Sequence, residues 1–258
     1  MWCVIEFMNR VLAYILLFGL SIFYGGRWAV SSTTQNPSNK QPLQFNPPNN
    51  DAPGGNRSQT SANTGSRDDC PTVETAITAL VPKTNWGTTL AERPTLWFYV
   101  PYQQGTLTLI LKDEATAAIF ARSDYPIEKG GGIMGFPLPE TVPSLEINRA
   151  YRWQVYFSCD PDIEPRFTEV QGVVERVAID SKFKRSLASM STVSEKVNLY
   201  AKQGLWHETI AEIIVTRQKQ PADPKLNELW LNLLADPHVA LEDFVSEPLV
   251  ECCNSPTQ

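Results

Sequence analysis

Two aromatic stretches of this 258-residue chain indicate how it folds: Thr95-Leu-Trp-Phe-Tyr-Val-Pro101 and Tyr151-Arg-Trp-Gln-Val-Tyr-Phe157. In both, side chains of one kind recur at every second position, which is the period of a β-strand. The first stretch places one set of side chains on one face, namely Leu96, Phe98 and Val100, and it places Trp97 and Tyr99 on the other. We expect the first set to face the core.

Similar short runs lie on either side of these stretches, divided by Pro and Gly. They cover residues 73–81, 107–111 and 167–177. Short strands at this spacing, without helices between them, favour an antiparallel sheet pair over a parallel sheet. We therefore predict an antiparallel, immunoglobulin-like β-sandwich over residues 70–178.

From Asp180 onward the apolar period becomes that of an α-helix. Four apolar stripes follow, carried by Phe183, Leu187 and Met190; by Val193, Val197, Tyr200 and Ala201; by Ile210, Ile213 and Ile214; and by Leu226, Leu229, Trp230, Leu233 and Leu234. Gly204 and Pro221-Ala-Asp-Pro224 are placed as helix boundaries. The fold class is therefore α+β, with a helical segment over 179–245 and a flexible tail over 246–258.

One helix pair, Leu199 to Ile210 followed by Pro221-Ala-Asp223, resembles a tetratricopeptide hairpin. A free-standing array needs about three such units, and only one copy is evident. Two interpretations remain open: a helical hairpin packed on the sandwich, or a partner-binding groove.

The N-terminal residues 1–30 read as an export leader. An uncharged apolar run of 14 residues, Val11 to Tyr24, follows Arg10. This is the length of a signal-peptide core and is shorter than the roughly 20 residues of a spanning helix. Ala29 has the right size to precede a cleavage site, but Arg27 fits that site poorly. A cleaved signal peptide and an uncleaved membrane anchor both remain open.

Residues 31–69 are polar or turn-forming apart from Leu43, Phe45, Ala52 and Ala62. Such a composition buries too little apolar surface to offset the entropy of ordering the chain. We expect a disordered linker here.

Five cysteines are present, and Cys70 and Cys159 flank the predicted sandwich. In an exported protein they would close a loop of about 90 residues, contributing roughly 4 to 5 kcal/mol by chain entropy. We predict this disulfide, with two buried thiols as the alternative. The adjacent Cys252 and Cys253 have no spacing suited to a metal.

The charge balance and the motifs exclude several functions. Twenty-two basic and 28 acidic residues give a net charge of -6, which argues against nucleic-acid binding. We find no motif for a catalytic nucleophile, a nucleotide loop or a zinc site, and we predict no catalytic residue, no metal and no cofactor. Asp160-Pro-Asp-Ile-Glu164 has the start of a calcium loop, but Pro165 replaces its glycine, which favours a solvated acidic loop.

Other polar residues carry a functional and a structural interpretation. Glu92 and Glu175 form either an acid–base couple or ion pairs with neighbouring arginines. His207 and His238 each stand at a predicted helix start, where packing outweighs catalysis.

Aromatic residues are the candidates for ligand or partner binding. If Trp97 and Tyr99 lie on the outer sheet face, with Tyr102 nearby, their rings offer a surface for a sugar or a protein. The alternative is that the helical segment covers them.

Five motifs together resemble one known family. They are Thr78-Ala-Leu-Val-Pro-Lys-Thr-Asn85, Glu92-Arg-Pro-Thr-Leu-Trp-Phe-Tyr-Val-Pro-Tyr102, Tyr151-Arg-Trp153, Cys159-Asp-Pro161 and Gly172-Val-Val-Glu-Arg-Val177, with Tyr200-Ala-Lys-Gln-Gly-Leu-Trp206 extending the match. The chain resembles the exported cyanobacterial family called domain of unknown function 928. The resemblance implies a cyanobacterial host and a periplasmic or secreted location, and it supplies no site residue.

These observations together predict an exported cell-envelope protein without enzymatic activity. Its expected partner is another envelope protein, and membrane contact is expected only through the N-terminal segment. A glycan-binding module using Trp97, Tyr99 and Tyr102 is the first alternative. A hydrolase using carboxylates such as Glu92 and Glu175 is the second.

Overall fold

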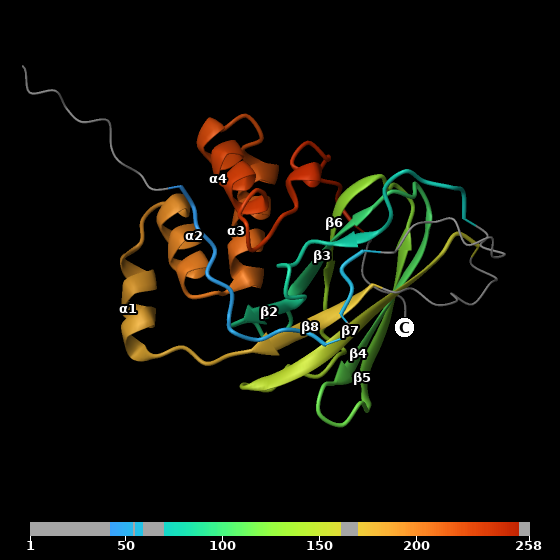
Figure 1. Ribbon diagram of the computed structural model, residues 1–258, viewed down its shortest axis with the longest axis horizontal. Coiled ribbons are helices and arrows are strands. Elements are labelled where there is room, and N and C mark those ends of the chain that lie inside the picture. Colours follow the sequence, from blue (N-terminus) through green and yellow to red (C-terminus); the bar gives the residue numbers. More distant parts are fainter. Residues whose placement is uncertain (1–41, 54, 59–69, 161–169, 253–258) are drawn as a thin grey trace, which may run out of the picture. The chain divides into compact units, whose positions relative to one another are not determined.

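The computed structural model describes residues 42–53, 55–58, 70–160 and 170–252 (Figure 1). Two β-sheets and four α-helices make up this part of the chain, and all four helices follow the strands in sequence. The α+β class predicted from the change of period at Asp180 is confirmed. Among these residues, none of the helices has the length and apolarity to cross a membrane. The predicted leader, residues 1–30, lies outside the described ranges.

The larger sheet has five strands in the order β2-β8-β7-β4-β5. These are β2 (Trp86–Thr89), β4 (Gly105–Asp113), β5 (Ile119–Ile127), β7 (Arg149–Ser158) and β8 (Gln171–Arg176). Every neighbouring pair is antiparallel except β2 and β8, which run parallel. The expectation of a wholly antiparallel fold is therefore wrong at this pair. Because β1 and β3 on either side of β2 belong to the other sheet, β2 enters by a crossover and not by a hairpin.

The smaller sheet has the order β1-β3-β6. It comprises β1 (Thr78–Ala79), β3 (Thr95–Val100) and β6 (Gly132–Pro137). Aromatic rings join it to the larger sheet: Phe98 of β3 meets Trp153 of β7 at 5.5 Å between centroids, and Tyr125 of β5 meets Phe136 of β6 at 5.2 Å. Two sheets packed through their inner faces are the arrangement that a β-sandwich requires. The immunoglobulin-like strand order stays a prediction.

The four predicted apolar stripes each form a helix: α1 (Ser181–Ser189), α2 (Val193–Lys202), α3 (Trp206–Lys219) and α4 (Pro224–Leu234). Side-chain caps fix three of their starts. Asp180 and Asp223 accept backbone hydrogen bonds before α1 and α4, and Thr192 forms a capping box with Glu195 before α2. Gly204 has φ +71°, a left-handed conformation suited to the turn between α2 and α3. A short 3-10 helix, η1 (Glu242–Phe244), follows α4.

The helices lie together beside the β2 and β8 edge of the larger sheet (Figure 1). The start of α3 is tied directly to this region. The indole Nε1 of Trp206 donates a hydrogen bond to the backbone oxygen of Leu80 at 2.9 Å, and the hydroxyl of Thr88 donates to the backbone oxygen of Gly204 at 2.7 Å. A tetratricopeptide-like groove stays a prediction, whereas packing of the helices on the strands is what the structure shows.

The predicted disordered linker is wrong for residues 42–53 and 55–58. Phe45 is fully buried and Leu43 is 5% exposed, because both side chains belong to the hydrophobic core. The amide of Phe45 donates to the Asp236 carboxylate at 2.9 Å, and that of Asn46 donates to the backbone oxygen of Ala201 at 3.0 Å. Two apolar anchors and long-range hydrogen bonds therefore order a segment whose composition is otherwise typical of disorder. The rest of the predicted linker lies outside the described residues.

The predicted flexible tail is also wrong at its beginning. Leu249 forms a parallel bridge with Ile133, the amide of Ile133 donates to the backbone oxygen of Pro248 at 2.8 Å, and the amide of Val250 donates back to Ile133 at 2.9 Å. This segment continues the smaller sheet beyond β6, where the edge strand offers unpaired backbone groups. Residues 253–258 lie outside the described ranges.

Candidate functional site

The three aromatic residues predicted to bind a ligand do not form one exposed surface. Trp97 is only 8% exposed, and its ring lies over Gly135, its cross-strand neighbour in β6, where there is no side chain to displace it. Tyr99 packs on Phe244 of η1 with ring centroids 5.1 Å apart. The C-terminal helical segment thus covers Tyr99, as the alternative interpretation proposed.

Tyr102 lies apart from this packing. Its ring stacks on Phe157 with centroids 4.7 Å apart and an interplanar angle of 17°, and both residues are half-buried. A binding role for Trp97, Tyr99 and Tyr102 stays a prediction, but burial leaves Trp97 little free surface.

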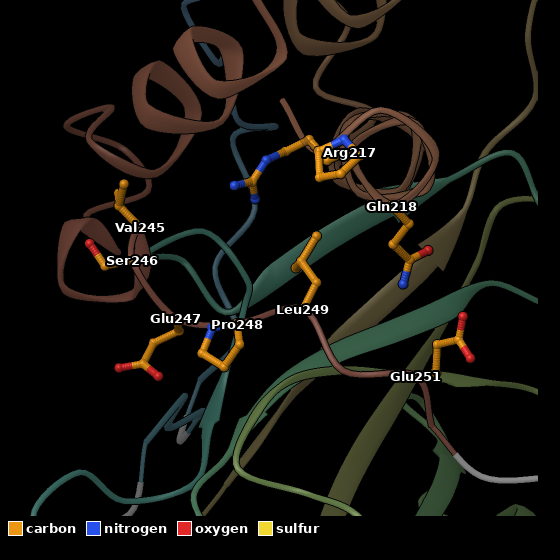
Figure 2. A pocket seen from close by; sticks show the side chains of 9 residues that line it. Arg217, Gln218, Val245, Ser246, Glu247, Pro248, Leu249 and Glu251 are labelled. Atoms are coloured by element: carbon orange, nitrogen blue, oxygen red, sulfur yellow. The ribbon is translucent and has the colours of Figure 1, made fainter. Parts of the chain in front are cut away.

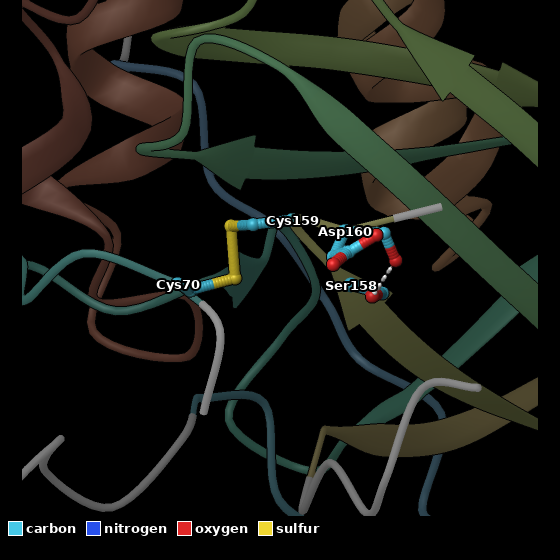
Figure 3. Close-up of a disulfide and its surroundings, with 4 residues drawn as sticks. All are labelled: Cys70, Ser158, Cys159 and Asp160. Atoms are coloured by element: carbon cyan, nitrogen blue, oxygen red, sulfur yellow. Dashed lines mark hydrogen bonds between the residues drawn. A yellow bond between two sulfur atoms is a disulfide. The ribbon is translucent and has the colours of Figure 1, made fainter. Parts of the chain in front are cut away.

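The predicted disulfide between Cys70 and Cys159 is present (Figure 3). It closes a sequence separation of 89 residues and joins the start of the strand region to the end of β7. Next to it, the hydroxyl of Ser158 donates to the backbone oxygen of Asp160 at 2.6 Å. Of the acidic loop weighed as a calcium site, Asp162 and Glu164 lie outside the described residues.

The carboxylates of the proposed acid–base couple each have a separate set of partners. Glu92 accepts from Arg176 at 3.1 Å and from the hydroxyl of Ser144 at 3.1 Å, and these contacts lower the pKa of Glu92. Glu175 accepts from the indole of Trp86 at 3.1 Å and from Asn50 at 3.4 Å. The ion-pair interpretation is therefore the one found at Glu92.

The two histidines take part in local packing and hydrogen bonding. His207 is 4% exposed and lies against Gly87, where an added Cβ would come within 2.7 Å of its Nε2. Neither ring nitrogen has a well-aligned hydrogen bond within the described residues, and burial lowers the pKa of His207 to about 4, opposed in part by the backbone of Thr95. The amide of His238 donates to the Asp236 carboxylate at 2.8 Å.

Glu208 follows His207 at the start of α3 and is also enclosed. One carboxylate oxygen accepts from the Thr89 hydroxyl at 2.8 Å and from the Leu90 amide at 2.7 Å. The other oxygen is buried without a partner in the described part of the chain, and burial raises the pKa of Glu208. Through their contacts with Gly87 and Thr89, His207 and Glu208 both pack at the junction between α3 and β2.

A pocket of about 520 Å³ lies where the end of α3 meets the C-terminal segment (Figure 2). Its apolar lining consists of Pro221, Val245, Pro248 and Leu249, and its polar lining consists of Arg217, Gln218, Ser246, Glu247 and Glu251. The pocket exists because residues 248–250 pair with β6 and so pass below the helix end. Its volume is within the range of sites that hold small ligands or short peptide segments.

Arg217 is the distinctive residue of this pocket. Its Nε donates to the side-chain oxygen of Asn227 at 3.2 Å, and its guanidinium lies over the ring of Trp230 at 5.1 Å. Its Nη1 is buried with no hydrogen-bond partner, and no ion pair of Arg217 occurs within the described residues. Burial lowers the pKa of Arg217. Arg217 is the one residue of the pocket lining with a buried polar atom that has no hydrogen-bond partner in the described part of the chain, which is an uncommon condition in folded proteins.

The pocket could not be found from the sequence. A basic residue in the last turn of a helix ordinarily serves the helix dipole, and most of the pocket lining comes from a segment more than 20 residues later.

The fold and the pocket together define a disulfide-bonded, β-rich domain with a helical extension and a ligand-sized pocket at their junction. The chain belongs to the family described as Domain of Unknown Function (DUF928), whose model matches residues 62–249. This range includes Arg217 and most of the pocket. No curated protein matches the chain.

Proposed function

We propose that this protein is an exported interaction module of the cell envelope, without enzymatic activity, that holds part of a partner polypeptide in the pocket between α3 and residues 245–251. One observation carries the proposal: Arg217, which has no ion pair within the described residues, lines an open pocket of about 520 Å³ together with four apolar residues. An acidic group of a partner would pair with the guanidinium, and the apolar lining would add contact area.

Two features support the exported location in this proposal. The Cys70–Cys159 disulfide is compatible with an oxidising compartment, and the N-terminal apolar run has the length of a signal-peptide core. The intact mass of the protein from its native host tests the location. Loss of about thirty residues, as removal of a leader requires, is the expected result. A full-length mass with thiols that react without reduction would contradict it.

Site-specific photocrosslinking in the native envelope tests the interaction. A photoreactive amino acid at Gln218, an exposed residue of the pocket wall, is expected to capture a reproducible protein partner. Lys182 of α1 is exposed, does not line the pocket and gives the matched control position. Absence of a partner specific to position 218 would contradict the proposal.

Glycan binding is a second candidate, favoured by the stacked and half-buried rings of Tyr102 and Phe157. Flat aromatic surfaces of this kind can pack on sugar rings. Retention of the protein on exopolysaccharide resin, lost in Tyr102→Ala, is the result this function requires. If the unaltered protein is not retained on the resin, glycan binding is contradicted.

A further inference from the structure

β5 forms one edge of the larger sheet and pairs with β4 and with no other strand of the described chain. It lies on the side of the sheet away from the helices (Figure 1). At the opposite edge, α3 packs on β2, and the hydroxyl of Thr89 donates to Glu208. An edge strand presents a row of unpaired N–H and C=O groups, which makes it a template for another strand.

Two irregularities delimit the regular part of β5. The pairing with β4 shifts register at Phe120, which has no opposite residue in β4, and the ring of Phe120 turns onto Tyr151 with centroids 4.5 Å apart. At the other end stands Pro126, which has no N–H to donate. The regular stretch between these two residues is 121–125, and Ser123 is its middle residue.

Pro126 also indicates which backbone groups of β5 point outward. A proline within a sheet is found where its nitrogen faces away from the neighbouring strand. Backbone groups of an antiparallel strand point to the two sides at alternate residues, so Arg122 and Asp124 have the same orientation as Pro126. The donors and acceptors that β5 offers within its regular stretch are therefore those of Arg122 and Asp124.

The side chains of the same two residues carry opposite charges on the outer face of the sheet. Asp124 lies opposite Thr108 and accepts its hydroxyl hydrogen bond, whereas the neighbours of Thr108 in β4, Leu107 and Leu109, are fully buried on the other face. Nε of Arg122 lies 3.6 Å from Oδ1 of Asp124, and the two side chains are 55% and 35% exposed. An edge with charges of one sign repels a second copy, but this edge carries one of each.

We propose that the protein forms a homodimer in which β5 of two copies pair antiparallel about a two-fold axis at Ser123. In this register Arg122 of each copy lies opposite Asp124 of the other, and the two exchange backbone hydrogen bonds. Each of the four charges then has an opposite charge both along its own strand and across the axis. A second copy is the occupant because this match of the edge with itself requires no other sequence. The dimer goes beyond the proposed function and does not involve the pocket.

Sedimentation equilibrium of the purified, oxidised protein over a concentration series tests the pairing. We expect a monomer–dimer equilibrium whose dissociation constant rises about tenfold or more in Arg122→Asp and in Asp124→Arg, because either change places like charges opposite each other at two positions. The double variant Arg122→Asp/Asp124→Arg should restore the dimer, since it recreates both opposite-charge pairs. Amide exchange at positions 122 and 124 should slow as the concentration of the unaltered protein rises.

Lys184→Asp is the matched control, because it makes the same change of charge at an exposed position of α1 and should leave the dimer unchanged. A urea unfolding curve for each variant separates loss of pairing from loss of folding. A monomer at every concentration, a dimer that both single variants retain, or a double variant that stays monomeric would overturn the inference. Its failure leaves the proposed function intact, because positions 122 and 124 do not line the pocket.

Discussion

Phe45 meets the indole of Trp206 edge-on, with ring centroids 5.1 Å apart. Both side chains are completely buried, although Phe45 lies in a segment with few apolar residues and Trp206 is the first residue of α3. Trp206 also donates its indole hydrogen bond to Leu80. One ring pair therefore connects the N-terminal segment, the helices and the strand region.

Phe45→Ala should lower the free energy of unfolding by about 3 to 5 kcal/mol, the usual cost of removing a buried Phe side chain. It should also release residues 42–53, which would then exchange their amide hydrogens rapidly. Urea unfolding and hydrogen exchange measure the two effects. Gln44→Ala, at the exposed neighbouring position, is the control and should change neither. A stability loss below about 1 kcal/mol would show that the segment is not anchored by this residue.

Burial of His207 should make stability sensitive to mild acid. Its pKa is lowered from 6.5 to about 4 in the folded protein, so the unfolded chain binds the proton first as the pH falls. Stability is therefore lost between about pH 6.5 and pH 4, by about 3 kcal/mol for this difference in pKa. The free energy of unfolding of His207→Gln should lack this part of the pH dependence.

His238→Gln, which removes the other histidine of the chain, is the matched control and should keep the dependence of the unaltered protein. The comparison uses slopes against pH, because the substitution at position 207 changes packing at every pH. Parallel curves for His207→Gln and the unaltered protein would contradict the burial of a neutral histidine.

Glu208 should have the opposite dependence on pH. Burial raises its pKa, so the folded protein keeps the proton at pH values where the unfolded chain has released it. The stabilising effect of the protonated form is complete below the unfolded pKa of 4.5 and is lost as the pH rises through the folded pKa. Glu208→Gln should therefore gain stability relative to the unaltered protein between pH 4.5 and pH 7.

The acceptor function of Glu208 is tested separately by Glu208→Ala. This change leaves the Thr89 hydroxyl and the Leu90 amide without their acceptor, at a cost of about 1 to 3 kcal/mol for each buried group. Urea unfolding at pH 7 should therefore rank Ala well below Gln. Equal stability of the two variants would show that these hydrogen bonds contribute nothing.

Removal of the Cys70–Cys159 disulfide should cost about 4 to 5 kcal/mol, because it constrains a long loop in the unfolded chain. The double variant Cys70→Ser/Cys159→Ser avoids a leftover thiol and is compared with the unaltered protein without reductant. A double variant as stable as the unaltered protein would show that the long loop contributes little.

Gly132→Ala should detach the C-terminal segment from β6. An added Cβ would lie 2.5 Å from the Pro248 oxygen and 2.8 Å from a methyl carbon of Val250. We expect a loss of about 1 to 3 kcal/mol from this crowding and faster exchange of the Val250 amide. Because Pro248 and Leu249 line the pocket, capture of a partner by the photoreactive group at position 218 should fall as well. Unchanged protection of Val250 would contradict the pairing.

The sequence predicts those elements whose apolar period is long and uninterrupted. β3, β7 and all four helices fall where the alternation or the helical stripe is clear, and Gly204 ends α2 as its position indicates. β5 and β6 are not predicted from the sequence because Pro126, Gly132 and Gly135 interrupt the alternation of apolar residues in these strands. These interruptions are tolerated because neighbouring strands and Trp97 supply the packing that the local sequence lacks.

The remaining differences come from contacts between distant parts of the chain. The composition of residues 31–69 does not indicate that Phe45 is buried. Its burial depends on contacts with Trp206 and Asp236, which lie far away in the sequence. The pocket is unpredictable for the same reason. Arg217 becomes distinctive only when residues 245–251 enclose it, and that enclosure depends on their pairing with β6.

The hydrogen bond from Phe45 to Asp236 spans 191 positions of the chain and sets the order in which the protein can mature. Asp236 has to leave the ribosome before Phe45 can form this hydrogen bond. Most of the polypeptide is therefore synthesised before the N-terminal segment can dock. Such distant closure slows folding, because loop entropy is lost before the contact forms. The N-terminal segment can therefore dock only after nearly all of the described chain has been made.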